Sequence, residues 1–254
     1  MNHIFDSHAH YDDSRFDPDR EELLAGLPEK GVAYIMNAGT NLETSRIGCD
    51  FAARYDFIYS SAGIHPQPAG DAPAGWEQAL REMVGESPKI KALGEMGLDY
   101  HYDFSPREMQ REVFEKQLIL SKELDLPVII HDREAHGDTM ELLRRHRPKG
   151  IVHCYSGSAE MVRELVKMEL YIGFTGVVTF KNARKTVEAA AAVPLERLLV
   201  ETDCPYMAPE PYRGKRCDSS MIAQTAQALA AIKGISAQEL LDATCENARR
   251  VYGI

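Results

Sequence analysis

The sequence predicts an α/β protein of the (β/α)8 TIM-barrel class, built as a single domain from residues 1–254. Eight short apolar segments alternate along the chain with longer amphipathic segments, and polar residues stand at the ends of most apolar ones. No repeat, linker or low-complexity stretch interrupts this pattern. A doubly wound open sheet has the same alternation, so the polar residues must separate the two folds.

The predicted strands are rich in Ile and Val, and most end in Gly, Pro or polar residues. Such apolar segments are typical of strands that are buried on both faces. In chain order they cover residues 3–10, 32–39, 58–66, 90–99, 127–134, 150–157, 171–176 and 197–206.

The predicted helices occupy the segments between and after these strands. They cover residues 19–29, 41–55, 76–86, 106–124, 137–146, 158–169, 183–192, 219–233 and 236–251. The clearest has apolar residues on one stripe at Met109, Val113, Leu120 and Leu124. Ser105 before Pro106 predicts its N-cap, and Ser236 with Glu239 predicts a capping box on the last helix.

The net charge and the cysteine usage restrict the kind of protein that this chain can be. The 254 residues carry a formal net charge of −10, which argues against a basic surface that holds long nucleic acid non-specifically. The five cysteines are scattered and form no C-x-x-C pair, as expected for reduced thiols in a cytoplasmic protein. No signal peptide, membrane span or obligate protein partner is indicated.

Polar residues stand toward the carboxyl ends of six of the predicted strands, in a pattern that favours the barrel. In a (β/α)8 barrel the carboxyl ends of all strands converge on one mouth, where active sites are found. Residues far apart in sequence would then share one pocket. The candidates are His8, His10, His65, Glu95, His131, His153 and Asp203.

The donor atoms of these side chains are nitrogen and oxygen. His8 and His10 are two residues apart, so on a strand both imidazoles point to the same face. A single histidine is more simply explained as a core or surface residue. Candidate ligands that recur at the ends of separate strands indicate a metal site more specifically. Six ligands exceed the needs of one zinc ion, so two ions that share a carboxylate fit the count better.

Several stretches resemble the TatD-type metal-dependent deoxyribonucleases, a branch of the amidohydrolase-like metal barrels. The resemblance runs from residue 5 to the C-terminus. It is carried by FDSHAH, AGIHP, LGEMGLDYH, LPVIIHDREA, VHCYSG, YIGFTG, LLVETDCPY, PYRGKR and ENARRVYGI.

The resemblance implies two divalent metal ions per chain, Mg, Mn or Zn, with Glu95 between them. The first ion would be held by His8, His10 and Asp203, and the second by His131 and His153. It also implies a 3'-5' exonuclease-type activity on DNA ends, with RNA ends as an alternative substrate. Asp203 would also act as the general base, and His65 would contact the scissile phosphate or the leaving group.

Two further groups of residues bear on the substrate. The basic cluster after the eighth strand, Arg213, Lys215 and Arg216, is predicted to contact phosphate, although a solvated loop is the default interpretation. Residues 100–102, with Tyr100, His101 and Tyr102, could stack a base or pack the loop.

The chain departs from the family pattern at two places. Many relatives follow R-G-K-R with Asn-Glu-Pro, where this chain has Cys217, Asp218 and Ser219. His often follows G-I-H-P, where this chain has Gln67. Both departures affect loops predicted to contact the substrate and leave the six ligands intact.

The sequence is compatible with three functions. They are a phosphodiesterase acting on nucleic-acid ends, an amidohydrolase-type enzyme that cleaves an amide, ester or lactone, and a non-catalytic metal-binding protein. The basic cluster and a glutamate at the bridging position favour the first.

Overall fold

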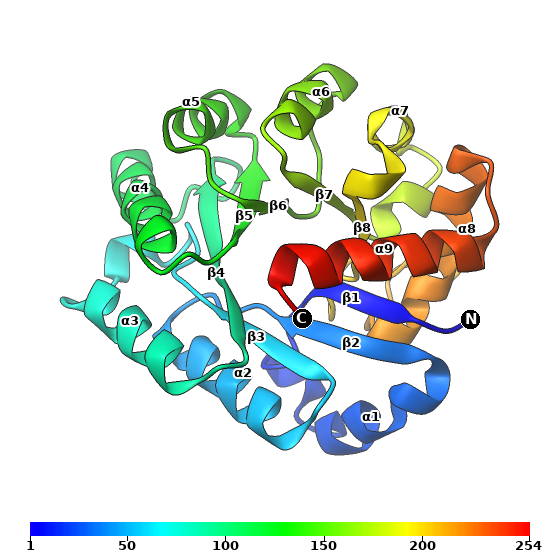
Figure 1. Ribbon diagram of the computed structural model, residues 1–254, viewed down its shortest axis with the longest axis horizontal. Helices are drawn as coiled ribbons and strands as arrows, with labels where there is room; N and C mark the ends of the chain where they lie inside the picture. Colours follow the sequence, from blue (N-terminus) through cyan, green and yellow to red (C-terminus); the bar gives the residue numbers. More distant parts are fainter. The chain divides into compact units, whose positions relative to one another are not determined.

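The computed structural model describes all 254 residues, Met1–Ile254, and contains one eight-stranded sheet with the strand order β1 to β8. Each strand is followed in the chain by at least one helix. Figure 1 shows this alternation along the colour gradient. The element order and strand order are those of the predicted (β/α)8 TIM barrel, and the predicted fold class is confirmed.

Contacts between residues divide the chain into two compact units. The first unit comprises Met1–Asn37 and Cys154–Arg250. Its strands are β1 (Ile4–Ala9), β2 (Val32–Asn37), β7 (Tyr171–Phe174) and β8 (Leu198–Val200). β1 pairs in parallel with β2, and β7 pairs in parallel with β8.

The first strand of the chain also lies beside the last one. A bridge joins Ala9, at the end of β1, to Cys204 in the segment after β8. The amide of His10 donates to the carbonyl of Cys204 at 2.8 Å, and the amide of Asp203 donates to the carbonyl of His8 at 2.9 Å. A sheet that joins its first strand to its last is the pattern of a barrel, whereas a doubly wound open sheet has two free edges.

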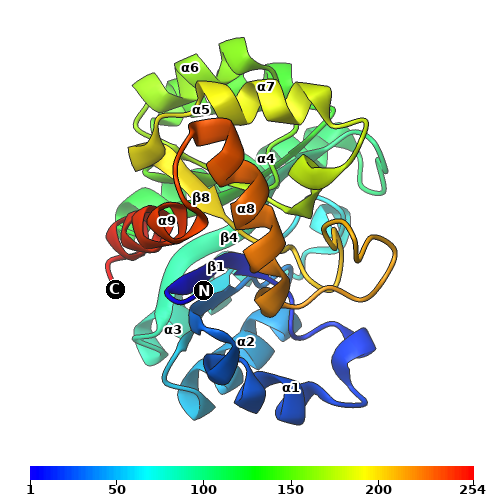
Figure 2. The ribbon, with the colours of Figure 1, turned by 90° about the vertical axis from the view of Figure 1, so that its right-hand side faces the viewer.

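The helices of the first unit follow the predicted ranges closely. They are α1 (Arg20–Gly26), α6 (Ala159–Lys167), α7 (Arg184–Ala192), α8 (Ile222–Lys233) and α9 (Ala237–Tyr252), the last of which extends past Arg250. α6 and α7 contact each other and lie side by side in Figure 2. The predicted capping box is confirmed, since Ser236 Oγ accepts from the Glu239 amide and Glu239 accepts from the Ser236 amide.

The second unit comprises Ala38–His153 and Val251–Ile254. Its strands are β3 (Ile58–Ala62), β4 (Ile90–Asp99), β5 (Val128–Arg133) and β6 (Gly150–Val152). Its helices are α2 (Leu42–Arg54), α3 (Trp76–Glu86), α4 (Arg107–Glu123) and α5 (His136–His146). β4 pairs in parallel with β5, which places Gly97 opposite His131 and Asp99 opposite Arg133.

The connections contain short 3-10 helices. They span Ser14–Phe16, Pro28–Lys30, Ala69–Asp71, Gly176–Thr179, Leu195–Arg197 and Ser219–Met221. Strands β6 and β8 have three residues each, so they end well before the predicted limits. The segments that follow them begin without regular secondary structure and carry polar side chains, among them His153 and Asp203.

The predicted N-cap of α4 is wrong. Pro106 occupies the cap position, and the hydroxyl of Ser105 donates instead to the carbonyl of Gln67 at 2.6 Å. The same hydroxyl oxygen accepts from the amide of Gly70 at 2.8 Å. Ser105 therefore ties the start of α4 to the loop after β3.

None of the helices combines the length and the apolar character needed to cross a membrane. The assignment of residues 1–254 to one domain stays a prediction.

Candidate metal centre

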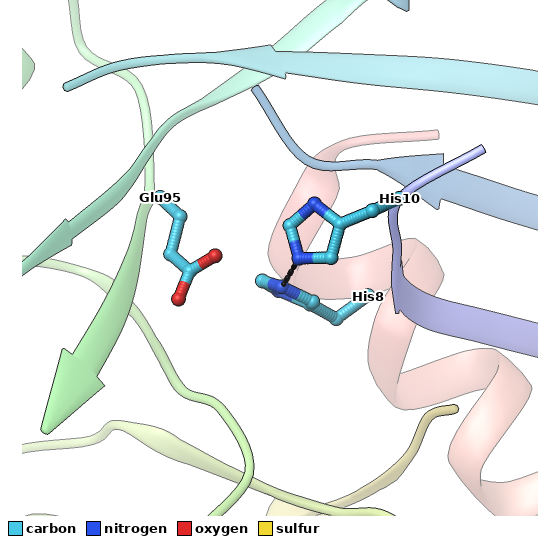
Figure 3. A group of neighbouring side chains, drawn as sticks. All are labelled: His8, His10 and Glu95. Carbon is cyan, nitrogen blue, oxygen red and sulfur yellow. Dashed lines mark hydrogen bonds between the residues drawn. The ribbon is translucent and has the colours of Figure 1, made fainter. Parts of the chain in front are cut away.

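The first unit brings together three of the predicted ligands, His8, His10 and Asp203. His8 lies in β1, and His10 is the residue after that strand. Their Nε2 atoms are 3.0 Å apart, as the dashed line in Figure 3 shows. Asp203 Oδ1 lies 3.3 Å from His10 Nε2 and 3.7 Å from His8 Nε2. All three side chains therefore direct a donor atom to one point.

A buried carboxylate anchors the backbone around Asp203. Asp6, fully buried in β1, accepts hydrogen bonds from the amide and the hydroxyl of Thr202 at 2.9 and 2.6 Å. It also accepts from the hydroxyl of Ser219 at 2.7 Å. Asp203 itself has a φ of 57°, a left-handed conformation that aspartate tolerates better than most residues. Asp6 thus joins β1 to the turn that presents Asp203.

The pKa of Asp6 reflects this environment. Burial raises the pKa to about 6, and the hydrogen bonds from Thr202 and Ser219 oppose that rise. Ser219 is one of the residues expected to depart from the family pattern. Its hydroxyl donates to Asp6 and contacts Tyr11 Oη, both at 2.7 Å. The departure at Ser219 therefore has a structural role inside the first unit.

The second unit brings together the other predicted ligands around Glu95, whose side chain is also drawn in Figure 3. Glu95 Oε1 lies 2.8 Å from His131 Nδ1 and 2.8 Å from His153 Nε2. His65 Nε2 lies 3.3 Å from the same oxygen. Glu95 and His153 are buried, with side chains only 3% exposed. One carboxylate oxygen thus stands among three imidazole rings.

Sequence reasoning missed Asp99, at the end of β4, as a member of this group. Its Oδ2 lies 3.3 Å from His131 Nε2 and accepts from Gln67 Nε2 at 3.1 Å. Its Oδ1 accepts from the amides of His101 and Tyr102, both at 3.0 Å. Asp99 belongs to the LGEMGLDYH stretch, but only its contact with His131 reveals a function.

Asp99 sets the proton arrangement of His131. A carboxylate at Nε2 favours a proton on that nitrogen, which leaves Nδ1 as the donor atom directed at Glu95. Burial acts to lower the pKa of His131, but Asp99 and Glu95 outweigh it and raise that pKa to about 9. In the metal-free protein both ring nitrogens therefore carry protons near pH 7, and a cation bound at Nδ1 would displace the proton there. The pKa of Asp99 falls well below its usual value. Burial opposes this, but the close contact with His131 and the hydrogen bonds from the Tyr102 amide and Gln67 prevail.

The donor sets of both clusters suit a divalent cation. A buried carboxylate is costly unless it is paired or coordinates a metal, and Glu95 and Asp99 are both buried. In the second unit, His65, Glu95 and His131 offer ligand atoms that all lie within 4.8 Å of one another. Imidazole with carboxylate is a set that Zn²⁺ and Mn²⁺ accept.

The three residues of the basic cluster differ in their surroundings. Arg216 donates from both terminal nitrogens to the carboxylate of Asp19, each at 2.6 Å, and its guanidinium lies over the ring of Phe16. Arg213 and Lys215 are exposed, with Arg213 over the ring of Phe180. Arg216 therefore ties its loop to the segment before α1, and phosphate contact by the cluster stays a prediction.

Buried histidine and carboxylate clusters on a (β/α)8 scaffold define the class of metal-dependent hydrolase barrels, and comparison with known proteins identifies the family. A family model described as "TatD related DNase" matches residues 5–253. The chain therefore belongs to the TatD family and is a metal-dependent hydrolase.

Individual relatives agree with this assignment. The Bacillus subtilis (strain 168) protein named "Uncharacterized metal-dependent hydrolase YabD" is 41% identical over 254 residues, or 99% of both chains. The Cronobacter sakazakii protein named "3'-5' ssDNA/RNA exonuclease TatD" is 38% identical over 212 residues, covering 81% of this chain and 80% of its own.

A solved structure extends the comparison to the fold. The crystal structure of YJJV, a TatD homologue from Escherichia coli K12, superposes with a TM-score of 0.93 at 30% identity. The superposition covers 99% of this chain and 98% of the YJJV chain.

Proposed function

We propose that this hydrolase is a nuclease that removes nucleotides from the 3' ends of single-stranded DNA, or of RNA, with two divalent metal ions. The observation that carries the proposal is Glu95 Oε1 at 2.8 Å from both His131 and His153. His8, His10 and Asp203 form a second donor set that suits another cation. The relatives named 3'-5' ssDNA/RNA exonuclease support the substrate class.

In this proposal the ligands divide between two ions. His8, His10 and Asp203 would hold one, His131 and His153 the other, and Glu95 would bridge them. When bound, the two cations would acidify a water and stabilise the charge on the attacking and leaving oxygens of the phosphodiester.

The remaining roles fall to the side chains. Asp203 would take the proton from the attacking water as its oxygen bonds to phosphorus. The bond from phosphorus to the leaving sugar oxygen would break at the same time, and that oxygen would take a proton from solvent. His65, buried beside Glu95, would contact the scissile phosphate or the leaving group. Arg213 and Lys215 are exposed and would contact phosphates further along the strand.

A substrate panel tests the proposal. Single-stranded DNA, RNA and small amides, esters and lactones are each incubated with Mg²⁺, Mn²⁺ or Zn²⁺. With DNA labelled at the 5' end, we expect the labelled strand to shorten stepwise while unlabelled mononucleotides are released, and the labelled nucleotide to appear last. Turnover of amides, esters or lactones without any nucleotide release would instead identify an amidohydrolase-type enzyme and refute the proposal.

We also propose a cytoplasmic location, supported by five free cysteines, three of which are buried. Cell fractionation that finds the protein outside the cytoplasm would refute it.

A further inference from the structure

An exposed aromatic pair stands on the loop after β4. Phe104 is 70% exposed, the largest value among the large hydrophobic side chains of the chain, and Tyr102 is 47% exposed. The two rings stack with centroids 5.3 Å apart and an interplanar angle of 27°. Single exposed hydrophobic residues are ordinary, but here two exposed aromatic rings stand together, stacked on each other.

A positively charged arginine side chain lies beside this aromatic pair. The guanidinium of Arg133 is 4.7 Å from the centroid of the Tyr102 ring. Arg133 ends β5, two residues after His131, and β4 pairs with it through Asp99. The aromatic pair therefore combines ring faces with a positive charge that could meet a phosphate.

The loop is held to the candidate metal centre by Asp99. The amide of Tyr102 donates to Asp99 Oδ1 at 3.0 Å, while Asp99 Oδ2 contacts His131 Nε2 at 3.3 Å. The amide of Tyr100 donates to the carbonyl of Arg133 at 2.9 Å. One carboxylate thus links the ring-bearing loop to a predicted metal ligand within the second unit.

We propose that Tyr102 and Phe104, with Arg133, form a stacking site for an unpaired base near the end of a single-stranded nucleic acid. This inference rests on the proposed nuclease function and names how that site holds its substrate. A base offers a flat π-face and an adjacent phosphate, which the rings and the guanidinium complement. Bases within a duplex already stack on both sides, so the site selects single strands.

The test compares the binding of single-stranded DNA by the parent protein and by a variant that lacks the ring of Phe104. Short oligothymidylates with phosphorothioate linkages, which resist hydrolysis, are titrated with the metal-loaded protein and followed by fluorescence anisotropy. Stacking contributes about 1–3 kcal/mol per base, so we expect Phe104→Ala to weaken binding roughly 5- to 150-fold. Phe104→Trp should restore affinity, because it retains a stacking ring.

Matched controls separate stacking from general damage. Ile119→Ala removes an apolar side chain of α4 that is 45% exposed, and it should leave binding unchanged. Oligothymidylates that carry one abasic position at a time should reveal one position at which Phe104→Ala causes no further loss. The salt dependence of binding should not change, because the ring carries no charge.

The outcomes distinguish the two proposals. If the parent protein binds and shortens single strands and Phe104→Ala matches it, the stacking site is refuted and the nuclease function stands. A loss that is equal for every abasic position also refutes stacking on a base. If the parent protein neither binds nor shortens any nucleic acid, the nuclease function fails and this inference fails with it.

Discussion

At the residue scale, the conformation and the partners of each charged side chain decide what it can do. Asp203 adopts a left-handed backbone conformation, with a φ of 57°, and its amide is held by the His8 carbonyl. Asparagine tolerates the same conformation, so Asp203→Asn changes basicity while it preserves the fold of the turn.

We expect Asp203→Asn to retain at least one metal ion and to lose activity by ~10²-fold or more, mainly in kcat. His65→Ala is the comparison, with intact metal content and a smaller loss. Steady-state kinetics with metal analysis checks both. Turnover by Asp203→Asn within a few-fold of the parent, with metals bound, would show that Asp203 is not the base.

Asp99 is a positioning residue, and its amide variant tests the proton arrangement of His131. In Asp99→Asn the carboxamide can still accept from the two loop amides, but its NH₂ then faces His131 Nε2. The ring must then move its proton to Nδ1, the atom directed at Glu95. We expect Mn²⁺ affinity to fall about 10- to 100-fold by calorimetry.

Asp103→Asn is the control for that variant, since this exposed carboxylate lies on the same loop and pairs with Arg107 at the start of α4. Its Mn²⁺ affinity should equal that of the parent. An unchanged affinity in Asp99→Asn would mean that another group orients His131.

At the element scale, close backbone approach and polar anchors determine how strands and helices meet. Gly97 in β4 has a φ of 146°, and a Cβ there would overlap the carbonyl oxygen of His131 in β5. Helix α4 meets the strand ends through buried glutamines. Gln117 exchanges two hydrogen bonds with the backbone of Ile64, and Gln110 exchanges two with the backbone of Asp99.

Gly97→Ala tests the close approach of β4 and β5. The added methyl forces one strand to shift at a predicted ligand, so we expect about 1–3 kcal/mol of destabilisation and weaker metal binding. Gly85→Ala in α3 meets no atom within 4 Å and should stabilise the protein by about 0.5–1 kcal/mol. Urea unfolding measures both; equal effects would refute the steric argument.

The contact between α4 and α5 carries a pH dependence. Glu115 accepts from His146 Nε2 at 2.8 Å and from Arg145 Nη1 at 2.9 Å, and these bonds, from His146 first, lower its pKa. A lowered folded-state pKa contributes stability above the unfolded value near 4.5, and that stability is lost as pH falls through the folded value.

Glu115→Gln should therefore reduce the free energy of unfolding at pH 7 by up to about 1 kcal/mol, because the pair is partly exposed. The difference from the parent should shrink as the pH falls below about 4.5. Urea unfolding across this pH range measures it. A difference that grows on acidification would contradict the assignment.

At the scale of the whole molecule, the metals link function to stability. Cations that bind only the folded chain stabilise it by about 2.7 kcal/mol when their concentration is 100-fold above Kd. We expect about two ions per chain by elemental analysis, with a chelator abolishing hydrolysis and lowering the Tm.

Glu95→Ala should bind both ions weakly, since both are proposed to share its carboxylate. Glu134→Ala removes an exposed carboxylate that pairs with His101, and its metal content should match the parent. Full occupancy in Glu95→Ala would refute the bridging role.

The sequence by itself determined the order of strands and helices and the residue types that follow the strands. Those features depend on short-range periodicity and on local caps such as Ser236 with Glu239, which neighbouring residues specify. The boundaries of α3 and β4 agree with the predicted ranges. The prediction that Met109 belongs to the apolar stripe of α4 is wrong, because it is 39% exposed while Gln110 is buried.

Only the tertiary structure decided which partner each buried or charged side chain has. Asp99 contacts His131 across paired strands, Arg216 binds Asp19 from almost the other end of the chain, and Phe104 stays in water. Such pairings depend on distances between residues far apart in sequence. Local propensity carries no information about those distances, because packing of the whole sheet and its helices sets them.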